Sequence, residues 1–480
     1  MTRTALVWFR RDLRRHDNAT LAAAAGADEV VPVYCFDPRE FGERPYGGPQ
    51  SFEYEKTGGH RTRFLVESVT DLREGLRADG SDLVVREGSL EDVLPRLAAV
   101  TDADELHYQS LPATEERTVE TAVTEAFAGS DVSVTSYWSH TLYHRDELPT
   151  EPASMPDTFT PWRKDVEANA AVRESQASPD LPPLPSLGDE GVGDVPTSPY
   201  GVTPTDAAAG STLPFRGGET RGLDRVDEYL WREDRLRRYK QTRNGLLGKA
   251  YSSKLSPWLA LGCLSPRQVH AEVKRYEAER VANESTYWLV FELLWRDFFQ
   301  FQFVKHGSGH FRREGIRNRT DLDWCWNDVR FRHWATGQTG IPFVDANMRE
   351  LNQTGFMSNR GRQNAASFLA NDLRLDWRRG AAYFETKLVD YDPCSNYGNW
   401  AYIAGVGNDS RDRSFDVLWQ AEEYDPDAAY IKHWLPELAD LPTEYAHRPW
   451  TMPRDERREH EIQFGVDYPE PMVSLARTKQ

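Results

Sequence analysis

Hydrophobic positions in the first 135 residues fall into short β-branched runs, which are separated by Ala-, Leu- and Arg-rich stretches of helical period. Short apolar runs favour buried strands, whereas apolar residues that recur every three to four positions favour helices. Strands that alternate with helices predict a doubly wound α/β domain with a parallel sheet over residues 1–135. The predicted strands span Thr4 to Phe9, Glu29 to Phe36, Leu83 to Arg86, Glu105 to Tyr108 and Val132 to Thr135.

The pattern changes after residue 135. Between Ser178 and Thr205 there are seven prolines and few large apolar residues, a composition typical of an extended connector. We therefore assign residues 136–216 to an interdomain linker. Beyond it, segments such as Tyr287 to Val304 and Gly361 to Trp377 carry apolar residues at helical spacing, which predicts an all-α domain over residues 217–450. Residues 451–480 are charged and poor in apolar residues, so we expect a short mobile tail.

Composition excludes several classes of protein. The chain has 480 residues, 39% of them hydrophobic, and a mean hydropathy of -0.68. Its apolar runs are far shorter than the roughly 20 residues that a bilayer requires, and the N-terminus lacks the apolar stretch of a secretory signal. We expect a cytoplasmic monomer. The four cysteines are dispersed without a C-x-x-C pair, so we predict neither a disulfide framework nor a metal site.

The net charge of -18 would repel nucleic acid if it were spread evenly. Only 10 of the 58 basic residues are Lys, and a surplus of acids with so little Lys is what a protein of a salt-rich cytoplasm needs to stay hydrated. We hypothesise a halophilic protein whose stability rises with molar salt. Between Trp231 and Lys254, however, eight basic residues face two acids, a local charge of 8 - 2 = +6. This basic stripe is either a solvated helix face or a surface for a phosphate backbone.

Two polar segments interrupt the apolar pattern of the helical part. They are Asn359 to Asn364 and Asp390 to Trp400, and the second brings two acids and two amides between apolar flanks. Buried carboxylates need cations, which Arg360 and Arg362 supply. A cofactor pocket is favoured over a structural ion-pair network. The first predicted strand, in contrast, is followed by no G-x-G-x-x-G motif, so the α/β domain is not expected to bind NAD there.

Several long stretches closely resemble the photolyase and cryptochrome flavoproteins, and in detail the DASH-type cryptochromes. The resemblance covers nearly the whole chain as far as Trp450. It implies a bent FAD inside the helical domain and a light-driven reaction in which excited FADH⁻ donates an electron to a cyclobutane pyrimidine dimer, which then splits. Such an enzyme is a carbon–carbon lyase. The matching stretches are Val7 to Arg14, Leu246 to Arg267, Glu292 to Phe303, Gly337 to Trp377 and Asp390 to Asn408.

The resemblance implies two groups of cofactor contacts. Hydroxyl and helix N-terminal N–H groups suit the pyrophosphate, and the matching residues are Ser252, Ser253, Lys254, Leu255 and Ser256; helix capping alone is the other interpretation of the serines. In the second group Arg362 pairs with Asp390 beside the isoalloxazine and Asn396 faces flavin N5. The remaining contacts of this group are Tyr239, Arg296, Asn359 and Asp392.

Three tryptophans match the photoreduction triad of the family. They are Trp400, Trp377 and Trp324, with spacings of 23 and 53 residues. Indole is oxidisable and polarisable, so neighbouring rings can pass an electron stepwise to an excited flavin. The alternative is that all three are ordinary core residues.

The substrate side resembles that of the dimer repair enzymes. Glu292 matches the carboxylate that bonds a flipped-out thymine dimer, and Trp295 matches the aromatic ring that packs against it. Gln363 and Tyr402 stand where strong duplex-repairing photolyases have Met and Trp. Less apolar surface means a smaller return on flipping a base out of a duplex, so single-stranded DNA is the expected substrate. The other implied DNA contacts are Arg243, Asn359 and Arg360.

The resemblance leaves three further points. Glu116 matches a glutamate that contacts a methenyltetrahydrofolate antenna. The alternative function is a blue-light photoreceptor that binds DNA or protein partners without repair, and a third possibility is a flavin protein without activity. Signalling cryptochromes usually have long C-terminal extensions, whereas only thirty residues follow Trp450 here. That difference favours the enzyme.

Overall fold

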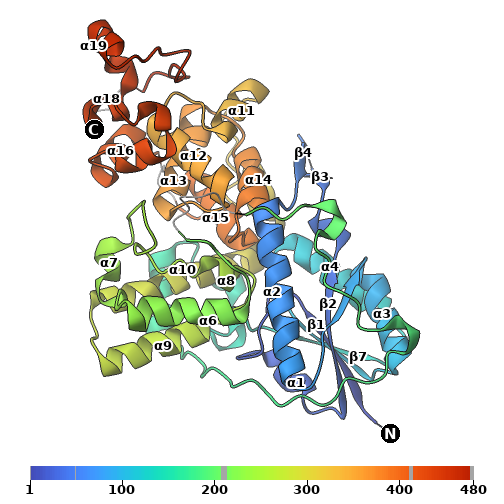
Figure 1. Cartoon of the computed structure of the whole chain (residues 1–480). Coiled ribbons are helices and arrows are strands. Elements are labelled where there is room, and N and C mark those ends of the chain that lie inside the picture. Colours follow the sequence, from blue (N-terminus) through green and yellow to red (C-terminus); the bar gives the residue numbers. More distant parts are fainter. Residues whose placement is uncertain (1, 49, 207–212, 410–413, 476–480) are drawn as a thin grey trace.

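The computed structural model describes residues 2–48, 50–206, 213–409 and 414–475, which form an α/β part and a helical part (Figure 1). The α/β part holds a five-stranded sheet of order β5-β2-β1-β6-β7, and every pairing in it is parallel. The predicted doubly wound fold is therefore confirmed. Its strands are β1 (Thr4–Phe9), β2 (Glu29–Phe36), β5 (Val84–Glu87), β6 (Glu105–Gln109) and β7 (Ser133–Tyr137), and a separate hairpin pairs β3 (Glu43–Pro45) with β4 (Glu53–Glu55).

Both faces of the sheet are covered by helices. Side chains alternate along a strand, so Val7 and Phe9 of β1 join one hydrophobic core while Leu6 and Trp8 join another. The first core includes residues of α1 (Ala19–Ala24) and α2 (Gly59–Ala78), and the second includes residues of α3 (Leu90–Thr101) and α4 (Thr114–Ala126). Burial on both sides explains why these strands are continuous apolar runs.

The second part is helical, as predicted. One predicted helical segment, 361–377, is divided: a π-helical turn at Phe368–Asp372 follows α13, and Arg374 takes φ +53° before α14 begins. The helices are α6 (Glu219–Asp227), α7 (Tyr239–Thr242), α8 (Ser256–Ala260), α9 (Pro266–Glu279), α10 (Glu284–His306), α11 (Asp328–Thr336), α12 (Pro342–Thr354), α13 (Asn359–Ser367), α14 (Trp377–Lys387), α15 (Pro393–Ile403), α16 (Val417–Tyr424), α17 (Ala429–Trp434), α18 (Thr443–His447) and α19 (Arg454–Glu459). Among the helices of the described ranges, none is both long and apolar enough to cross a bilayer.

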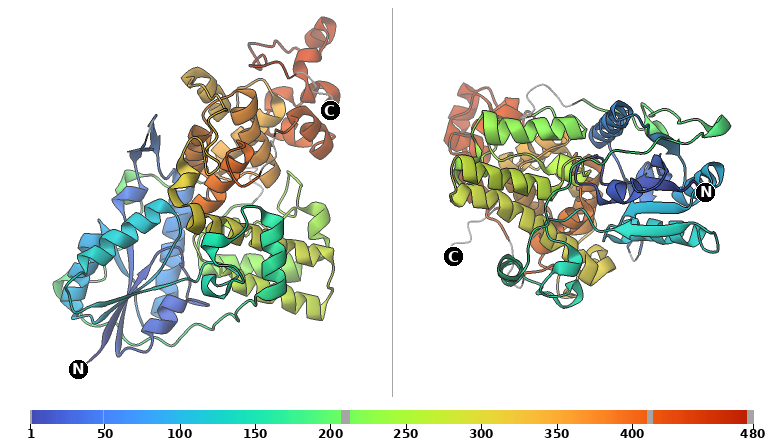
Figure 2. Two further views of the ribbon diagram at one scale, coloured as in Figure 1. Left: turned by 180° about the vertical axis from the view of Figure 1, so that it is seen from behind. Right: turned by 90° about the horizontal axis from the view of Figure 1, so that it is seen from below.

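The linker contacts both parts of the molecule, since its stretch around Pro183 and Val192 hydrogen-bonds to the α/β part, and the C-terminal segment packs on the helical part. The linker contains α5 (Phe159–Asn169), which packs against α10 (Figure 2). The C-terminal segment differs from our expectation of a mobile tail, because Tyr468 is fully buried and donates a hydrogen bond to Asp345 Oδ2 at 2.6 Å. A tail of charged residues is thus anchored by its few apolar ones up to residue 475. Residues 476–480 lie outside the described ranges.

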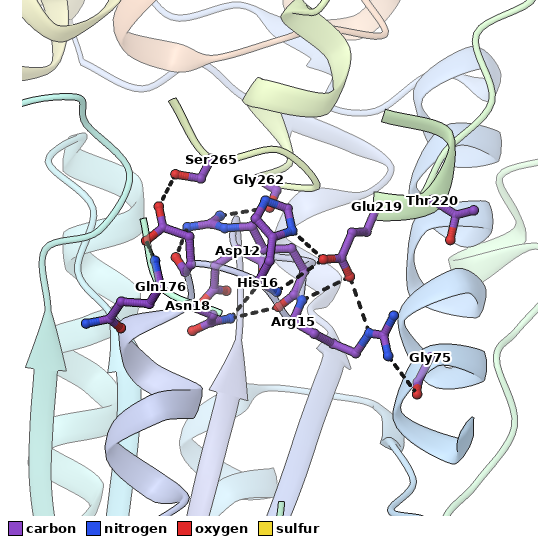
Figure 3. A network of polar contacts seen from close by, with 12 residues as sticks. Asp12, Arg15, His16, Asn18, Gly75, Gln176, Glu219, Thr220, Gly262 and Ser265 are labelled. Carbon is purple, nitrogen blue, oxygen red and sulfur yellow. Dashed lines mark hydrogen bonds and ion pairs between the residues drawn. The ribbon is translucent and has the colours of Figure 1, made fainter. Parts of the chain in front are cut away.

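The loop after β1 ties the two parts together through a polar network that we call the interdomain clasp (Figure 3). Glu219 of α6 accepts hydrogen bonds from the backbone N–H groups of Arg15 (3.0 Å) and His16 (3.1 Å) and also contacts both side chains. Asp17, which is fully buried, accepts two hydrogen bonds from Arg267 at 2.8 and 3.0 Å. Buried charges thus meet partners from the other part of the molecule.

A close backbone approach accompanies the clasp. The Leu13 N–H donates to the Leu261 carbonyl at 3.3 Å. Gly262 follows with φ +66°, and a Cβ there would lie 1.9 Å from the Arg11 carbonyl oxygen. Glycine is the residue that fits both the left-handed conformation and the contact.

Replacing Glu219 by Gln is expected to lower the free energy of unfolding at neutral pH by about 3 kcal/mol, because it leaves buried donors poorly paired. Burial alone would raise the pKa of Glu219, but bonds from His16 and two backbone N–H groups outweigh it and lower the pKa below 4.5. The stabilisation is therefore present above pH 4.5 and is lost as the pH falls through the folded-state pKa.

Chemical denaturation at neutral and acid pH checks this prediction. The variant should show a weaker acid dependence than the parent chain, while Glu74→Gln on the exposed face of α2 serves as the control. An acid dependence that is unchanged in Glu219→Gln would contradict it.

Candidate functional site

The two polar segments singled out in the sequence meet in one cavity. α13 carries the first segment and α15 the second, and α14 lies between them in the chain and packs on α15. Of the predicted cofactor contacts, Asn359, Arg362, Asp390, Asp392 and Asn396 line it together with apolar side chains, whereas Tyr239, Arg296 and the segment Ser252 to Ser256 are not part of its lining. The cavity is lined by Asn359, Arg362, Gln363, Ala366, Phe384, Leu388, Asp390, Tyr391, Asp392, Ser395, Asn396, Asn399, Trp400 and Ile403.

Asp390 provides the clearest sign that this cavity binds a ligand. Its Oδ2 accepts hydrogen bonds from Arg362 Nη2 at 2.8 Å and from Ser256 Oγ at 2.6 Å. Its Oδ1 is buried and has no partner within the described chain. A buried carboxylate oxygen without a donor is costly. The geometry therefore fits a ligand that presents an N–H or O–H group, as the ring system and ribityl chain of FAD do.

Asp392 and Asn396 are held in place by the surrounding helices. Asp392 caps α15 by accepting from the Ser395 N–H at 2.7 Å, and its other oxygen accepts from Gln300 Nε2 at 2.9 Å. Asn396 Nδ2 donates to the Ala381 carbonyl at 2.9 Å, which fixes the orientation of the amide. Gln300 was not predicted from the sequence. The sequence signal that could have identified Gln300 is its polar amide within the aromatic run of α10.

The serine-rich segment before α8 is a compact turn. Ser252 has φ +48° and Lys254 has φ +57°, left-handed values that fold the chain back on itself. Ser253 and Leu255 are buried, whereas Ser256 is exposed. Lys254 is buried and donates to the Tyr251 carbonyl at 2.8 Å, and burial lowers the pKa of Lys254 to about 6. The turn thus places Ser253, Lys254 and Ser256 directly before and at the start of α8.

Glu292, which the resemblance assigns to the substrate, lies on α10. Its carboxylate forms an ion pair with Arg243, whose guanidinium stands 4.3 Å from the centre of the Trp288 ring. Burial raises the pKa of Glu292, and Arg243 opposes the rise. Tyr239 is buried nearby. Its burial, and to a lesser extent the charge of Glu292, raises the pKa of the Tyr239 hydroxyl. The Glu292 carboxylate is thus partly withdrawn from water and paired with one cation, Arg243.

Trp295, one turn further along α10, is fixed by a side chain of the linker. Phe159 stacks on it with ring centroids 3.7 Å apart and an interplanar angle of 9°. Tyr402 meets the indole edge-on at 6.5 Å and donates a hydrogen bond to Asp409 Oδ2 at 2.8 Å. The half-buried indole therefore has one face covered by the protein. Sequence analysis missed Phe159, because its partner is 136 residues away in the chain.

Arg360 organises the mouth of the cavity. It donates to Gln363 Oε1 at 3.2 Å, to Gln420 Oε1 at 3.2 Å and to Asn244 Oδ1 at 3.3 Å. Its guanidinium lies 4.3 Å from the centre of the Tyr424 ring. We call these five residues the cavity mouth. The exposed Asn359 begins the same helix, α13.

Two predicted contacts look different in the structure. Arg296 donates to the backbone carbonyls of His140 and, at 3.3 Å, of Leu259, so it joins the linker to the helical part. The basic stripe is largely neutralised by carboxylates, most of which lie outside the stretch Trp231 to Lys254. The charge of +6 counted along the chain thus overstates the attraction for phosphate. The paired residues are Arg232, Arg235, Arg237, Lys240, Arg243 and Lys249.

The three tryptophans of the predicted electron path occupy neighbouring segments. Trp400, Trp377 and Trp324 are all buried, with exposed fractions of 2%, 0% and 8%. Gly380, one turn after Trp377, lies against Trp400 so closely that a Cβ would come within 2.3 Å of the indole. The Arg313 carbonyl accepts from Trp377 Nε1 at 3.1 Å, and its guanidinium donates to the Trp324 carbonyl at 2.7 Å. The least buried indole is thus the last of the series.

Comparison with known proteins decides the family. Residues 5–185 match the family model of DNA photolyase, and residues 288–480 match that of the FAD binding domain of DNA photolyase. The chain is 57% identical over 478 residues to the cryptochrome DASH of Natronomonas pharaonis, with 98% of each chain covered. The protein belongs to the DASH cryptochromes.

Solved structures agree with this assignment. The DASH cryptochrome described here superposes on a Synechocystis sp. cryptochrome with a TM-score of 0.93 at 47% identity, covering 98% of this chain and 96% of that one. A class III photolyase from Agrobacterium tumefaciens gives a TM-score of 0.86 at 29% identity, covering 99% and 95%. FAD is accordingly the cofactor of this DASH cryptochrome.

A second cavity of the DASH cryptochrome, of about 440 Å³, lies between its two parts. It is open to the carboxyl ends of β1, β2 and β6, where ligands of parallel sheets commonly bind, and Tyr391 and Pro393 of the helical part close it. Glu116, which the resemblance matched to a folate-contacting glutamate, lines it. Burial raises the pKa of Glu116 to about 7 despite Arg11 nearby, and its Oε2 has no partner in the described ranges.

On the expectation that Trp295 packs against a pyrimidine dimer, replacing Phe159 by Ala should weaken the binding of dimer-containing DNA roughly ten-fold, because the indole loses the ring that holds it. The flavin content should stay unchanged, since Phe159 does not line the cavity between α13, α14 and α15. Binding titrations with a dimer-containing oligonucleotide check the prediction. Phe159→Tyr, which keeps the stack, should restore affinity, and a Phe159→Ala variant with unaltered affinity would contradict the argument.

Proposed function

We propose that this DASH cryptochrome repairs cyclobutane pyrimidine dimers in single-stranded DNA by light-driven electron transfer. The observation that carries the proposal is the placement of Glu292 and Trp295 on one face of α10, with Tyr402 joining Trp295 to the helix that carries Asn396. FAD, when bound and reduced, supplies an electron after absorbing blue or near-UV light. The remaining tasks are binding and orientation, which fall to side chains of the protein.

Glu292 and Trp295 have complementary roles in holding a flipped dimer. The Glu292 carboxylate is paired with Arg243, and an ionised carboxylate can accept a hydrogen bond from the N–H of a pyrimidine ring. The indole of Trp295 offers its free side to the apolar face of the dimer. Asn396 is oriented by Ala381, so its amide is presented to the flavin in a fixed direction.

The preference for single strands follows from the cost of extrusion. Taking a base out of a duplex costs a few kcal/mol, and this cost is smallest when the strand is already single. Gln363 and Tyr402 present polar groups next to the place where a dimer would sit, and both are engaged with other side chains. A flipped dimer would therefore gain less apolar contact energy from Gln363 and Tyr402 than from Met and Trp at the same positions.

The test is to illuminate the reduced protein with the same dimer-containing oligonucleotide in single-stranded and double-stranded form. We expect loss of dimers in the single strand and much slower loss in the duplex. Glu292→Gln should slow repair, whereas Glu284→Gln, exposed at the start of the same helix, should not. No repair of either form would leave the photoreceptor function, and equal repair of both would contradict the roles of Gln363 and Tyr402.

We also propose that the 440 Å³ cavity holds a methenyltetrahydrofolate antenna. Its support is the Oε2 of Glu116, which is buried without a partner in the described part of the chain, in a site that Trp8 and Tyr34 also line. A hydrogen bond to a charged group contributes about 1.5–3 kcal/mol. Glu116→Ala should therefore reduce folate affinity roughly ten-fold or more while FAD is retained.

Near-UV absorption of the reconstituted protein measures the antenna content. Glu125→Ala, on the exposed side of the same helix, is the matched control. Full folate retention in Glu116→Ala would contradict the assignment of this cavity without affecting the flavin site.

A further inference from the structure

One indole on the surface lies beside the cavity mouth and has no role so far. Trp419 of α16 is 51% exposed. The next residue, Gln420, is buried and accepts a hydrogen bond from Arg360 at 3.2 Å. One side of α16 is therefore hydrogen-bonded to α13, while the side chain of the neighbouring Trp419 lies exposed to solvent.

Flat groups connect this indole with the cavity. The Trp419 ring meets the Tyr424 ring edge-on, with centroids 6.5 Å apart and an interplanar angle of 86°. The Arg360 guanidinium lies 4.3 Å from the centre of the Tyr424 ring and donates to Gln363, which lines the flavin cavity. Nucleobases stack on aromatic rings and on guanidinium planes. These side chains form a row from the cavity, where the proposed flipped base would lie, to the Trp419 indole on the surface.

Charge around Trp419 selects the kind of contact. Asp416 caps α16 and accepts from the Trp419 N–H at 3.0 Å, Glu422 forms an ion pair with Arg448, and Glu423 is exposed. These carboxylates, in a chain of net charge -18, repel phosphates. The face of a nucleobase carries no charge and is apolar. An exposed indole in acidic surroundings therefore favours a base over a phosphate backbone.

We propose that Trp419 is a stacking platform for an unpaired nucleobase that flanks the nucleotide in the cavity. The proposal rests on DNA binding at the cavity, as in the proposed function, and identifies the residue that selects single strands. In a duplex both faces of each base are already stacked, so the indole gains a partner only from a single strand. This stacking adds affinity that the neutralised basic stripe does not provide.

The test is equilibrium binding of an undamaged oligothymidylate in the dark, which needs neither a dimer nor electron transfer. Trp419→Ala is expected to weaken binding roughly ten-fold, the effect of losing one base–aromatic stack. Trp419→Phe should restore most of the affinity. The matched control is Trp326→Ala, which removes an equally exposed indole (48%) that lies against Phe52 and Arg379.

Salt and strandedness separate stacking from charge. Phosphate contacts weaken steeply with salt, so the difference between Trp419→Ala and the parent chain should persist at high salt and be absent for duplex DNA. Unchanged affinity in Trp419→Ala, or an equal loss in Trp326→Ala, would overturn the proposal. A protein that binds oligothymidylate through Trp419 yet repairs no dimer would refute the proposed function alone.

Discussion

Trp377→Phe is expected to stop photoreduction of the bound flavin without removing the flavin. Trp377 lies between the other two indoles of the path, joined to Trp324 through Arg313 and placed one turn before the glycine that touches Trp400. Phenylalanine keeps the ring in the core but is far harder to oxidise than indole. The measurement is the loss of oxidised-flavin absorbance under blue light with an external reductant, and the rate should fall to the background.

Two controls make this result specific. Trp434→Phe removes another buried indole, outside the path, and should leave photoreduction intact. Repair that starts from chemically reduced flavin should survive Trp377→Phe, because the electron then need not enter through the indoles. Normal photoreduction in Trp377→Phe would reduce the three tryptophans to core packing.

Asp390→Ala is expected to produce a protein that purifies almost free of flavin. The change leaves the Arg362 guanidinium and the Ser256 hydroxyl without their acceptor. It also removes the buried Oδ1, which has no hydrogen-bond donor within the described residues. Removing one partner of a buried ion pair costs about 3–5 kcal/mol, which corresponds to roughly a 100- to 4,000-fold loss of affinity if it falls on cofactor binding. The ratio of flavin to protein absorbance and a titration with FAD measure it.

Asp440→Ala, at an exposed position, is the matched control for this variant. Asp390→Asn should lie between the parent chain and Asp390→Ala, since it keeps the volume and the acceptor but loses the charge. Full flavin content in Asp390→Ala would show that the cavity lined by α13, α14 and α15 is not where the cofactor is held.

Periodicity in the sequence was enough to predict the elements that are buried on a regular face. The runs Thr4 to Phe9 and Glu29 to Phe36 are strands with those bounds, because burial on both sides leaves apolar residues at every position after the first. The polar segments on α13 and α15 were conspicuous for the same reason, as their surroundings are apolar. Local pattern thus locates the site, and the resemblance supplies its chemistry.

Contacts between distant segments could not be predicted in this way. Phe159 on Trp295 depends on how the linker folds over α10, and Gln300 on Asp392 depends on the angle between α10 and α15. The neutralisation of the basic stripe could not be predicted either, since Glu284, which pairs with Lys240 of the stripe, belongs to a different helix. The C-terminal segment is anchored by a few buried apolar residues such as Tyr468, which the average composition of the segment does not reveal.

The interdomain clasp has a consequence for light harvesting. The cavity of about 440 Å³, in which we propose a folate antenna, is lined by both parts of the molecule, with Trp8 on the sheet side and Tyr391 on the helical side. Excitation passes between two pigments with an efficiency that depends steeply on their separation and mutual angle. Glu219 and Arg267 join the two parts, so with an antenna bound they would hold both quantities constant. In that case the clasp would set the geometry of energy transfer as well as the joint between the two parts.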